Sequence, residues 1–166
     1  MDDLETLAEQ VGAALQCRGL MLARAESCTG GWVGAAVTSV AGSSNWYERG
    51  FITYTNQSKQ EMLSVTAATL TEYGAVSEPT VREMAAGALK HSHADVALAI
   101  SGIAGPGGAT PTKPVGTVYI AWSLRTGAAR SQSFRFEGDR EAVRRQAVAA
   151  ALRGTLAIIE ENQALV

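Results

Sequence analysis

The feature that most constrains the fold is an uninterrupted apolar run, Val96 to Ile100, followed by a long segment rich in glycine and proline. A strand covered on both faces has this continuous apolar character, whereas a strand with one face in water alternates between apolar and polar residues. The glycines and prolines from Gly102 to Gly116 suit neither a helix nor a strand. We therefore expect a buried strand in the middle of a sheet, with a loop at its carboxyl end.

Helix and strand signals alternate along the rest of the chain. We expect helices over 4–18 and 32–40, short helices within 56–74, a helix that begins at Ser77-Glu78-Pro79 and one capped by Asp139. We expect strands at 20–23, 49–55 and 95–101, and a hairpin of 115–124 with 128–136. This mixture predicts an α/β fold, a three-layer α/β/α sandwich whose sheet is partly parallel and partly antiparallel. The length of 166 residues is typical of one domain, so we assign 1–166 to a single domain.

Composition excludes several classes of function. Hydrophobic residues make up 46% of the chain, but no run of 18 apolar residues could span a bilayer, so we expect no membrane partner. The net charge is −2 with no basic block, which argues against a nucleic-acid partner. Asp2, Asp3, Glu5 and Glu9 are the opposite of the positive start of a secretory signal. We expect a cytoplasmic protein.

Neither a metal nor a cofactor is expected. Cys17 and Cys28 lack CxxC spacing, and His91 and His93 end a helix without further ligands nearby in the sequence. The glycine-rich segment fails the G-x-G-x-x-G pattern, and no Walker A sequence occurs, so a nucleotide-binding oxidoreductase is disfavoured. Cys28 has no histidine placed to activate it, and we interpret it as a buried thiol.

Three polar segments follow the expected strands or lie close to them, where open α/β sheets bind ligands. Glu26 to Gly31 precedes a helix and is either an anion cradle or an ordinary capped helix start. Ser43-Ser44 lies before Tyr54 and Lys59. Ser101 to Gly108 is either a loop whose backbone approaches a ligand or a structural turn.

A serine nucleophile needs a base, and lysine is the alternative to histidine. Of the three lysines, Lys90 lies in the last turn of a helix and Lys113 in a proline-rich loop, which leaves Lys59. To act as a base near neutral pH, its pKa must fall by about three units from ~10.4, which corresponds to roughly 4 kcal/mol of desolvation or neighbouring charge. Without that burial Lys59 would be an ordinary surface residue at a helix start.

Several segments together resemble the CinA C-terminal domain family, especially its stand-alone nicotinamide-nucleotide amidases. They are Ala25 to Gly31, Gly42 to Ser44, Gly50 to Lys59, Gly74 to Ser77, Ser101 to Pro106 and Lys113 to Gly116, in the family's order. The resemblance implies hydrolysis of nicotinamide mononucleotide to nicotinate mononucleotide and ammonia by a Ser-Lys amidohydrolase in pyridine nucleotide salvage. It also implies that the chain forms a homodimer or a higher homo-oligomer.

The resemblance implies a role for each matching residue. Ser44 would be the nucleophile, with Ser27 the second choice, Lys59 the base and Tyr54 a hydroxyl that orients or relays. The substrate would be bound by Ser27, Thr29, Gly30, Gly31, Ser101, Gly102, Gly105 and Arg140, with Arg144 as the alternative to Arg140 for the phosphate. Both arginines could instead belong to a solvated first helical turn. Family members often carry threonine at the position of Ser101.

A non-catalytic nucleotide-binding or interaction module is the rival hypothesis. The competence and damage-inducible label of the family suggests such a module, and loss of both the hydroxyl and the amine would favour it. The chain retains Ser44 and Lys59. We therefore favour the enzyme.

Overall fold

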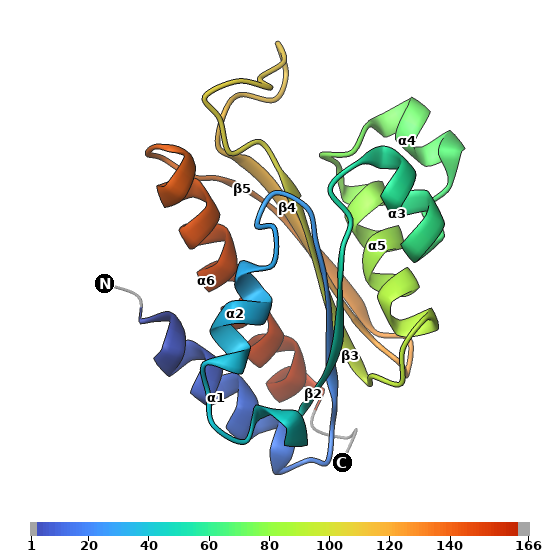
Figure 1. Ribbon diagram of the computed structural model, residues 1–166. Coiled ribbons are helices and arrows are strands. Elements are labelled where there is room, and N and C mark those ends of the chain that lie inside the picture. Colours follow the sequence, from blue (N-terminus) through green and yellow to red (C-terminus); the bar gives the residue numbers. More distant parts are fainter. Residues whose placement is uncertain (1–2, 163–166) are drawn as a thin grey trace.

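The computed structural model describes residues 3–162 and shows a five-stranded sheet between two layers of helices (Figure 1). The strands are β1 (Leu22–Glu26), β2 (Tyr47–Ile52), β3 (Val96–Gly102), β4 (Thr117–Leu124) and β5 (Ala129–Arg135). The helices are α1 (Leu4–Gln16), α2 (Trp32–Thr38), α3 (Asn56–Leu63), α4 (Ala67–Tyr73), α5 (Glu78–Lys90) and α6 (Arg140–Glu161), with a short 3-10 helix, η1 (Ser43–Asn45). None of the helices within 3–162 combines the length and the apolar character needed to cross a bilayer.

The sheet is mixed, as the sequence predicts. Its strand order is β2-β1-β3-β4-β5, in which β1 pairs with β2 and β3 in parallel, while β4 pairs antiparallel with β3 and β5. The apolar run of β3 is central and buried, which confirms the expectation from its sequence. Parallel strands have their carboxyl ends at one edge, so the segments that leave β1, β2 and β3 meet there.

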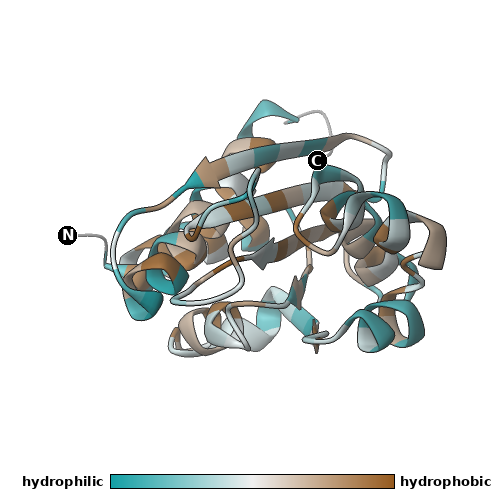
Figure 2. Ribbon diagram, turned by 90° about the horizontal axis from the view of Figure 1, so that it is seen from above, coloured by the Kyte–Doolittle hydropathy of each residue, from teal (hydrophilic) through white to brown (hydrophobic). Residues whose placement is uncertain are grey.

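The two faces of β3 carry different side chains. Val96, Leu98 and Ile100 belong to the core shared with α1, α2 and α6, whereas Ala97 and Ala99 belong to the core shared with α5. Small alanine side chains allow α5 to pack close to the sheet. Viewed from above, the strands form the middle layer and hydrophilic segments gather on outlying helix turns (Figure 2).

Local signals explain where the helices begin. The side chain of Ser77 accepts a hydrogen bond from the Thr80 amide at the start of α5, and that of Asp139 caps α6 in the same way. β1 differs from expectation: it covers Leu22–Glu26, not 20–23. Two charged side chains therefore lie within a strand that the apolar pattern alone would end earlier.

Candidate active site

A cavity of about 190 Å³ lies at the edge where β1, β2 and β3 end. Its lining comes from the segments that follow these three strands, from the connection between α4 and α5, and from the start of α6. The lining residues are Ser27, Cys28, Tyr54, Lys59, Ala75, Val76, Ser101, Gly102, Ala104 and Arg140. A lysine amine, three hydroxyls and a guanidinium therefore meet in one small space.

Lys59 enters this cavity from the first turn of α3. A capping box begins the helix, in which the Thr55 side chain accepts from the Ser58 amide and the Ser58 hydroxyl accepts from the Thr55 amide. The Lys59 side chain is buried, 1% exposed, and its Nζ donates to Ser27 Oγ at 3.0 Å and to the Thr53 carbonyl at 2.8 Å. Burial, which removes water from the charged form, lowers the pKa of Lys59 to about 8. The amine is thus half neutral near pH 8.

Ser27 occupies the first position after β1. Its amide donates to the Ile100 carbonyl of β3 at 3.0 Å, which fixes its backbone against the central strand. Its side chain is buried, and its hydroxyl is the only one that Lys59 Nζ contacts within residues 3–162. A hydroxyl next to an amine that can be neutral is the geometry of a nucleophile and its base.

Ser44 lies before the amino end of β2, at the opposite end of the strand from the cavity. The structure therefore does not bring it next to Lys59, contrary to the expected pairing. It sits in η1, before β2 begins, whereas α3 follows the end of β2. The six residues of β2 span about 20 Å at the usual rise of ~3.3 Å per residue. The Ser44 side chain is exposed. The second choice, Ser27, is therefore the serine that meets the lysine.

The order of the elements along the chain explains why Ser27, and not Ser44, lies next to Lys59. In parallel strands, residues that follow one strand lie near residues that follow its neighbour. Ser27 and Lys59 both follow their strands, while Ser44 precedes β2. Ala75, Val76 and Ala104 also line the cavity. These three residues fall within segments that resemble the family, but sequence reasoning assigned none of them a role, because their side chains carry no reactive group.

Tyr54 and Arg140 lie together at the mouth of the cavity. Arg140 Nη2 donates to Tyr54 Oη at 3.2 Å, and its Nη1 donates to the Gly105 carbonyl at 2.8 Å. Tyr54 is 59% exposed, so its ring faces solvent at the entrance. Ser101 and Gly102, at the end of β3, line the wall of the cavity. Gly105 touches this site through its carbonyl.

The remaining predicted binding residues face a neighbouring groove of about 580 Å³. Thr29, Gly30 and Gly31 line this groove and do not line the cavity that contains Lys59. Arg144 is also there: it donates to the carbonyls of Cys28 and Thr29, and its guanidinium lies over the Trp32 ring at 5.4 Å. The structure thus places Arg140, not Arg144, beside the amine and the hydroxyl.

Cys28 and the histidines are not alternatives to Ser27. Burial raises the pKa of the Cys28 thiol to about 11, so its thiolate is scarce at neutral pH. His91 follows α5 and contacts the Ser64 hydroxyl through Nε2 at 2.9 Å. Within the part of the chain that the structure describes, no group of three or more His, Cys, Asp or Glu side chains could hold a metal ion.

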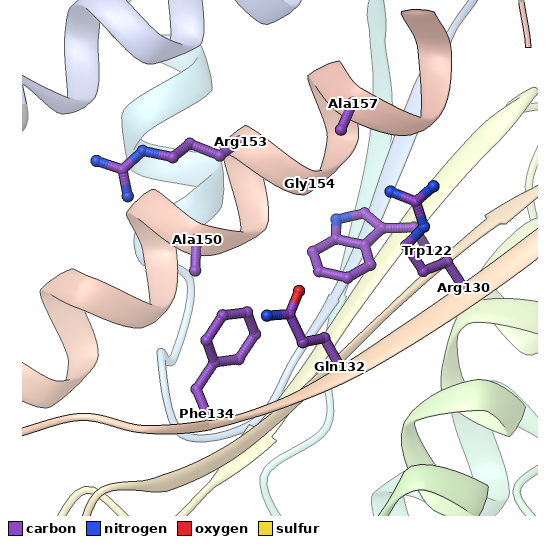
Figure 3. Close-up of a pocket in the computed structure, with 8 residues that line it drawn as sticks. All are labelled: Trp122, Arg130, Gln132, Phe134, Ala150, Arg153, Gly154 and Ala157. Carbon is purple, nitrogen blue, oxygen red and sulfur yellow. The ribbon is translucent and has the colours of Figure 1, made fainter. Parts of the chain in front are cut away.

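Another cavity, of about 290 Å³, lies between α6 and the strands β4 and β5 (Figure 3). The Trp122 ring and the side chains of Gln132 and Phe134 line one wall, and Ala150 and Gly154 of α6 line the other (Figure 3). None of its lining side chains within residues 3–162 carries a hydroxyl, thiol, carboxylate or amine. It therefore offers no nucleophile.

The fold and the site define a mixed α/β/α domain with a buried serine–lysine pair at the carboxyl edge of its parallel strands. The sequence model of the CinA C-terminal domain matches residues 4–159. The chain belongs to this family.

Similarity to known proteins in sequence and in structure supports this family membership. The chain is 55% identical over 151 residues to nicotinamide-nucleotide amidohydrolase PncC of Escherichia coli, covering 91% of this chain and 92% of that protein. It is 48% identical to a CinA-like protein of Akkermansia muciniphila, covering 91% of this chain and 36% of that longer protein. The crystal structure of the competence/damage inducible protein CihA from Agrobacterium tumefaciens superposes with a TM-score of 0.93 at 44% identity, covering 95% of this chain and 96% of that one.

Proposed function

We propose that this protein hydrolyses the carboxamide of nicotinamide mononucleotide to nicotinate mononucleotide and ammonia, with Ser27 as nucleophile and Lys59 as base. The observation that carries the proposal is the 3.0 Å contact between Lys59 Nζ and Ser27 Oγ in a buried cavity. The amidohydrolase name of the Escherichia coli relative supports the choice of substrate. By the same argument the protein would act in pyridine nucleotide salvage.

The first half of the reaction is acyl transfer. The neutral Lys59 amine takes the Ser27 proton as Oγ bonds to the carboxamide carbon, and the resulting ammonium protonates the amide nitrogen as the carbon–nitrogen bond breaks. Ammonia leaves and an ester on Ser27 remains. In the second half, Lys59 takes a proton from water, which attacks the ester carbon and releases the carboxylic acid and the serine hydroxyl.

The oxyanion of each tetrahedral intermediate needs a hydrogen-bond donor. The Ser27 amide is unavailable because it donates to Ile100. The next amide, that of Cys28, donates to no backbone carbonyl within 3–162 and contacts its own thiol. Cys28 also lines the cavity. We assign the Cys28 amide to the developing oxyanion, and we assign Arg140 at the cavity mouth to the substrate phosphate, since guanidinium binds phosphate through a fork of donors.

The assay is ammonia release from nicotinamide mononucleotide. Ser27→Ala and Lys59→Ala should each lower kcat by about 10³-fold or more, because nucleophile and base act as a unit. Ser44→Ala is the matched control: it removes the same hydroxyl at the far edge of the sheet and should retain parental turnover. Full activity in Ser27→Ala would refute the nucleophile assignment. A parent that binds the nucleotide without releasing ammonia would favour the non-catalytic module.

A further inference from the structure

Glu26 is a buried carboxylate that the proposed reaction leaves without a role. It ends β1, immediately before Ser27, and its side chain is 0% exposed. It does not line the cavity, so a substrate bound there would not contact it. Among residues 3–162, the hydrogen bonds of Lys59 Nζ go to Ser27, Thr53 and Tyr54. A buried charge is costly unless hydrogen bonds and a counter-charge compensate it, so its surroundings indicate what it does.

The Glu26 carboxylate gathers the donors of the turn that follows Ser27. Oε1 accepts from the Thr29 hydroxyl at 2.6 Å and from the amides of Gly31 and Val33 at 3.2 and 3.0 Å. Oε2 accepts from the Gly34 amide at 3.1 Å. All four donors lie in the turn or in the first residues of α2. One side chain therefore ties residues 29–34 back to the end of β1.

Arg24 completes this arrangement as the counter-charge. Its Nη1 lies 2.8 Å from Glu26 Oε2, and its Nε donates to Tyr47 Oη at 2.8 Å. The guanidinium fits between two glycines, because a Cβ added at Gly34 or at Gly50 would lie 2.6 or 2.4 Å from Arg24 Nε. Glycines in α2 and β2 thus leave the room that the Arg24 side chain occupies.

The tethered turn contains two consecutive glycines in the left-handed region of backbone space. Gly30 and Gly31 have φ values of 59° and 111°, and neither angle suits residues with a side chain. Ser27 and Cys28 lie between the end of β1 and the donors that Glu26 holds. A change in the tether would therefore move the hydroxyl relative to Lys59 Nζ.

We propose that Glu26 is a positioning residue: with Arg24 as counter-charge, it holds the 27–31 turn so that Ser27 Oγ stays against Lys59 Nζ and the Cys28 amide stays beside the reacting carbonyl. This rests on the proposed function. It goes beyond that function because Glu26 acts without contact to the substrate. Structural support alone would affect stability, whereas positioning affects the chemical step in a folded protein.

The test compares Glu26→Gln with the parent. Glutamine keeps the volume and one acceptor oxygen but loses the charge and places a donor among donors. We expect kcat for ammonia release to fall by about tenfold or more with KM changed by less than about two-fold. The rate of Ser27 labelling by a fluorophosphonate, measured well below the unfolding temperature, should fall by a similar factor.

Asp95→Asn is the matched control. Asp95 accepts one hydrogen bond, from the Met21 amide at 2.9 Å, at the opposite end of the strands, so Asp95→Asn makes the same change from carboxylate to amide far from the cavity. It should lower thermal stability without changing kcat or labelling. Parental kcat and labelling in a folded Glu26→Gln would overturn the proposal.

Two further arms keep the result interpretable. If Glu26→Gln does not fold, Thr29→Val removes a single donor from Oε1, and it should slow labelling by several-fold; parental labelling would overturn the proposal. If the parent releases no ammonia from nicotinamide mononucleotide yet labels at Ser27, the proposed substrate is wrong. The labelling comparison between the variants and the parent then still decides the role of Glu26.

Discussion

A single buried amine links folding and chemistry in this protein. The three acceptors of Lys59 Nζ are the Ser27 hydroxyl and the carbonyls of Thr53 and Tyr54, all uncharged. Within residues 3–162 no ionised partner offsets the loss of water around the ammonium form, and the pKa of Lys59 falls from 10.5 to about 8. The sequence singled out Lys59 by elimination, but only the folded chain shows its burial.

The pH dependence of activity should follow this amine. Because the base must be neutral, kcat/KM should rise about tenfold per pH unit below pH 8 and level off above it. Ammonia release measured from pH 6 to 9.5 gives the profile, and Ser44→Ala should reproduce it. A flat profile across this range would show that Lys59 is not the base.

The same pKa shift should appear in stability. Between pH 8 and 10.5 the unfolded chain holds the Lys59 proton more tightly than the folded chain, so the free energy of unfolding rises with pH, by up to about 3 kcal/mol. In Lys59→Met this rise of the free energy of unfolding with pH should be absent. Urea unfolding at pH 7 and pH 10 should show the parent gaining stability relative to Lys59→Met, whereas Lys90→Met, at an exposed lysine, should change in parallel with the parent.

At the scale of elements, the packing of α5 against α3 positions Lys59, the proposed base. Gly87 of α5 lies so close to the Leu63 carbonyl at the end of α3 that an added Cβ would overlap it. The sequence predicts α5 well, because its cap and its apolar face are both local signals. It cannot show that Gly87 is a contact point, because that depends on where the neighbouring helix lies.

Gly87→Ala should therefore destabilise the fold. The overlap involves backbone, which cannot rotate away, and overpacking of this kind costs about 1–3 kcal/mol although alanine favours helices. Thermal or urea unfolding measures the loss. Gly107→Ala is the control, because an added Cβ there meets nothing within 4 Å. Equal stability of the two variants would contradict the packing argument.

Among the strands too, some features follow from the local sequence pattern and others depend on contacts between residues distant in the sequence. The apolar run of β3 and the β4–β5 hairpin were predictable from pattern alone. β1 was misplaced by two to three residues because Arg24 and Glu26 look like the end of a strand until their ion pair is known. The expected pairing of Ser44 with Lys59 has a related origin, because nearness in sequence suggested it, whereas strand direction brings Ser27 to Lys59.

At the scale of the whole molecule, one lysine joins two walls of the cavity. Lys113, in the glycine- and proline-rich loop, donates from Nζ to the carbonyls of Tyr73 and Val76 at 3.1 and 2.5 Å. Val76 lines the cavity on one side and Ala104, at the start of the same loop, on another. The loop and the α4–α5 connection are thereby held together around the opening.

Lys113→Met should loosen this opening without touching the reacting groups. We expect KM for nicotinamide mononucleotide to rise several-fold with kcat within about two-fold of the parent. Steady-state kinetics measures the split, with Lys90→Met as a control lysine variant. A fall in kcat at constant KM would indicate that the loop acts on the chemical step instead.

The hydrogen bond from the Ser27 amide to the Ile100 carbonyl has a consequence for biosynthesis. A nascent chain that has emerged only through α3 already contains Ser27 and Lys59. It also contains β1 and β2, but it lacks β3, the central strand of the sheet. If the proposed pair is the active site, we expect it to form only once β3 is in place, so a truncated chain that ends before residue 96 should release no ammonia from the nucleotide.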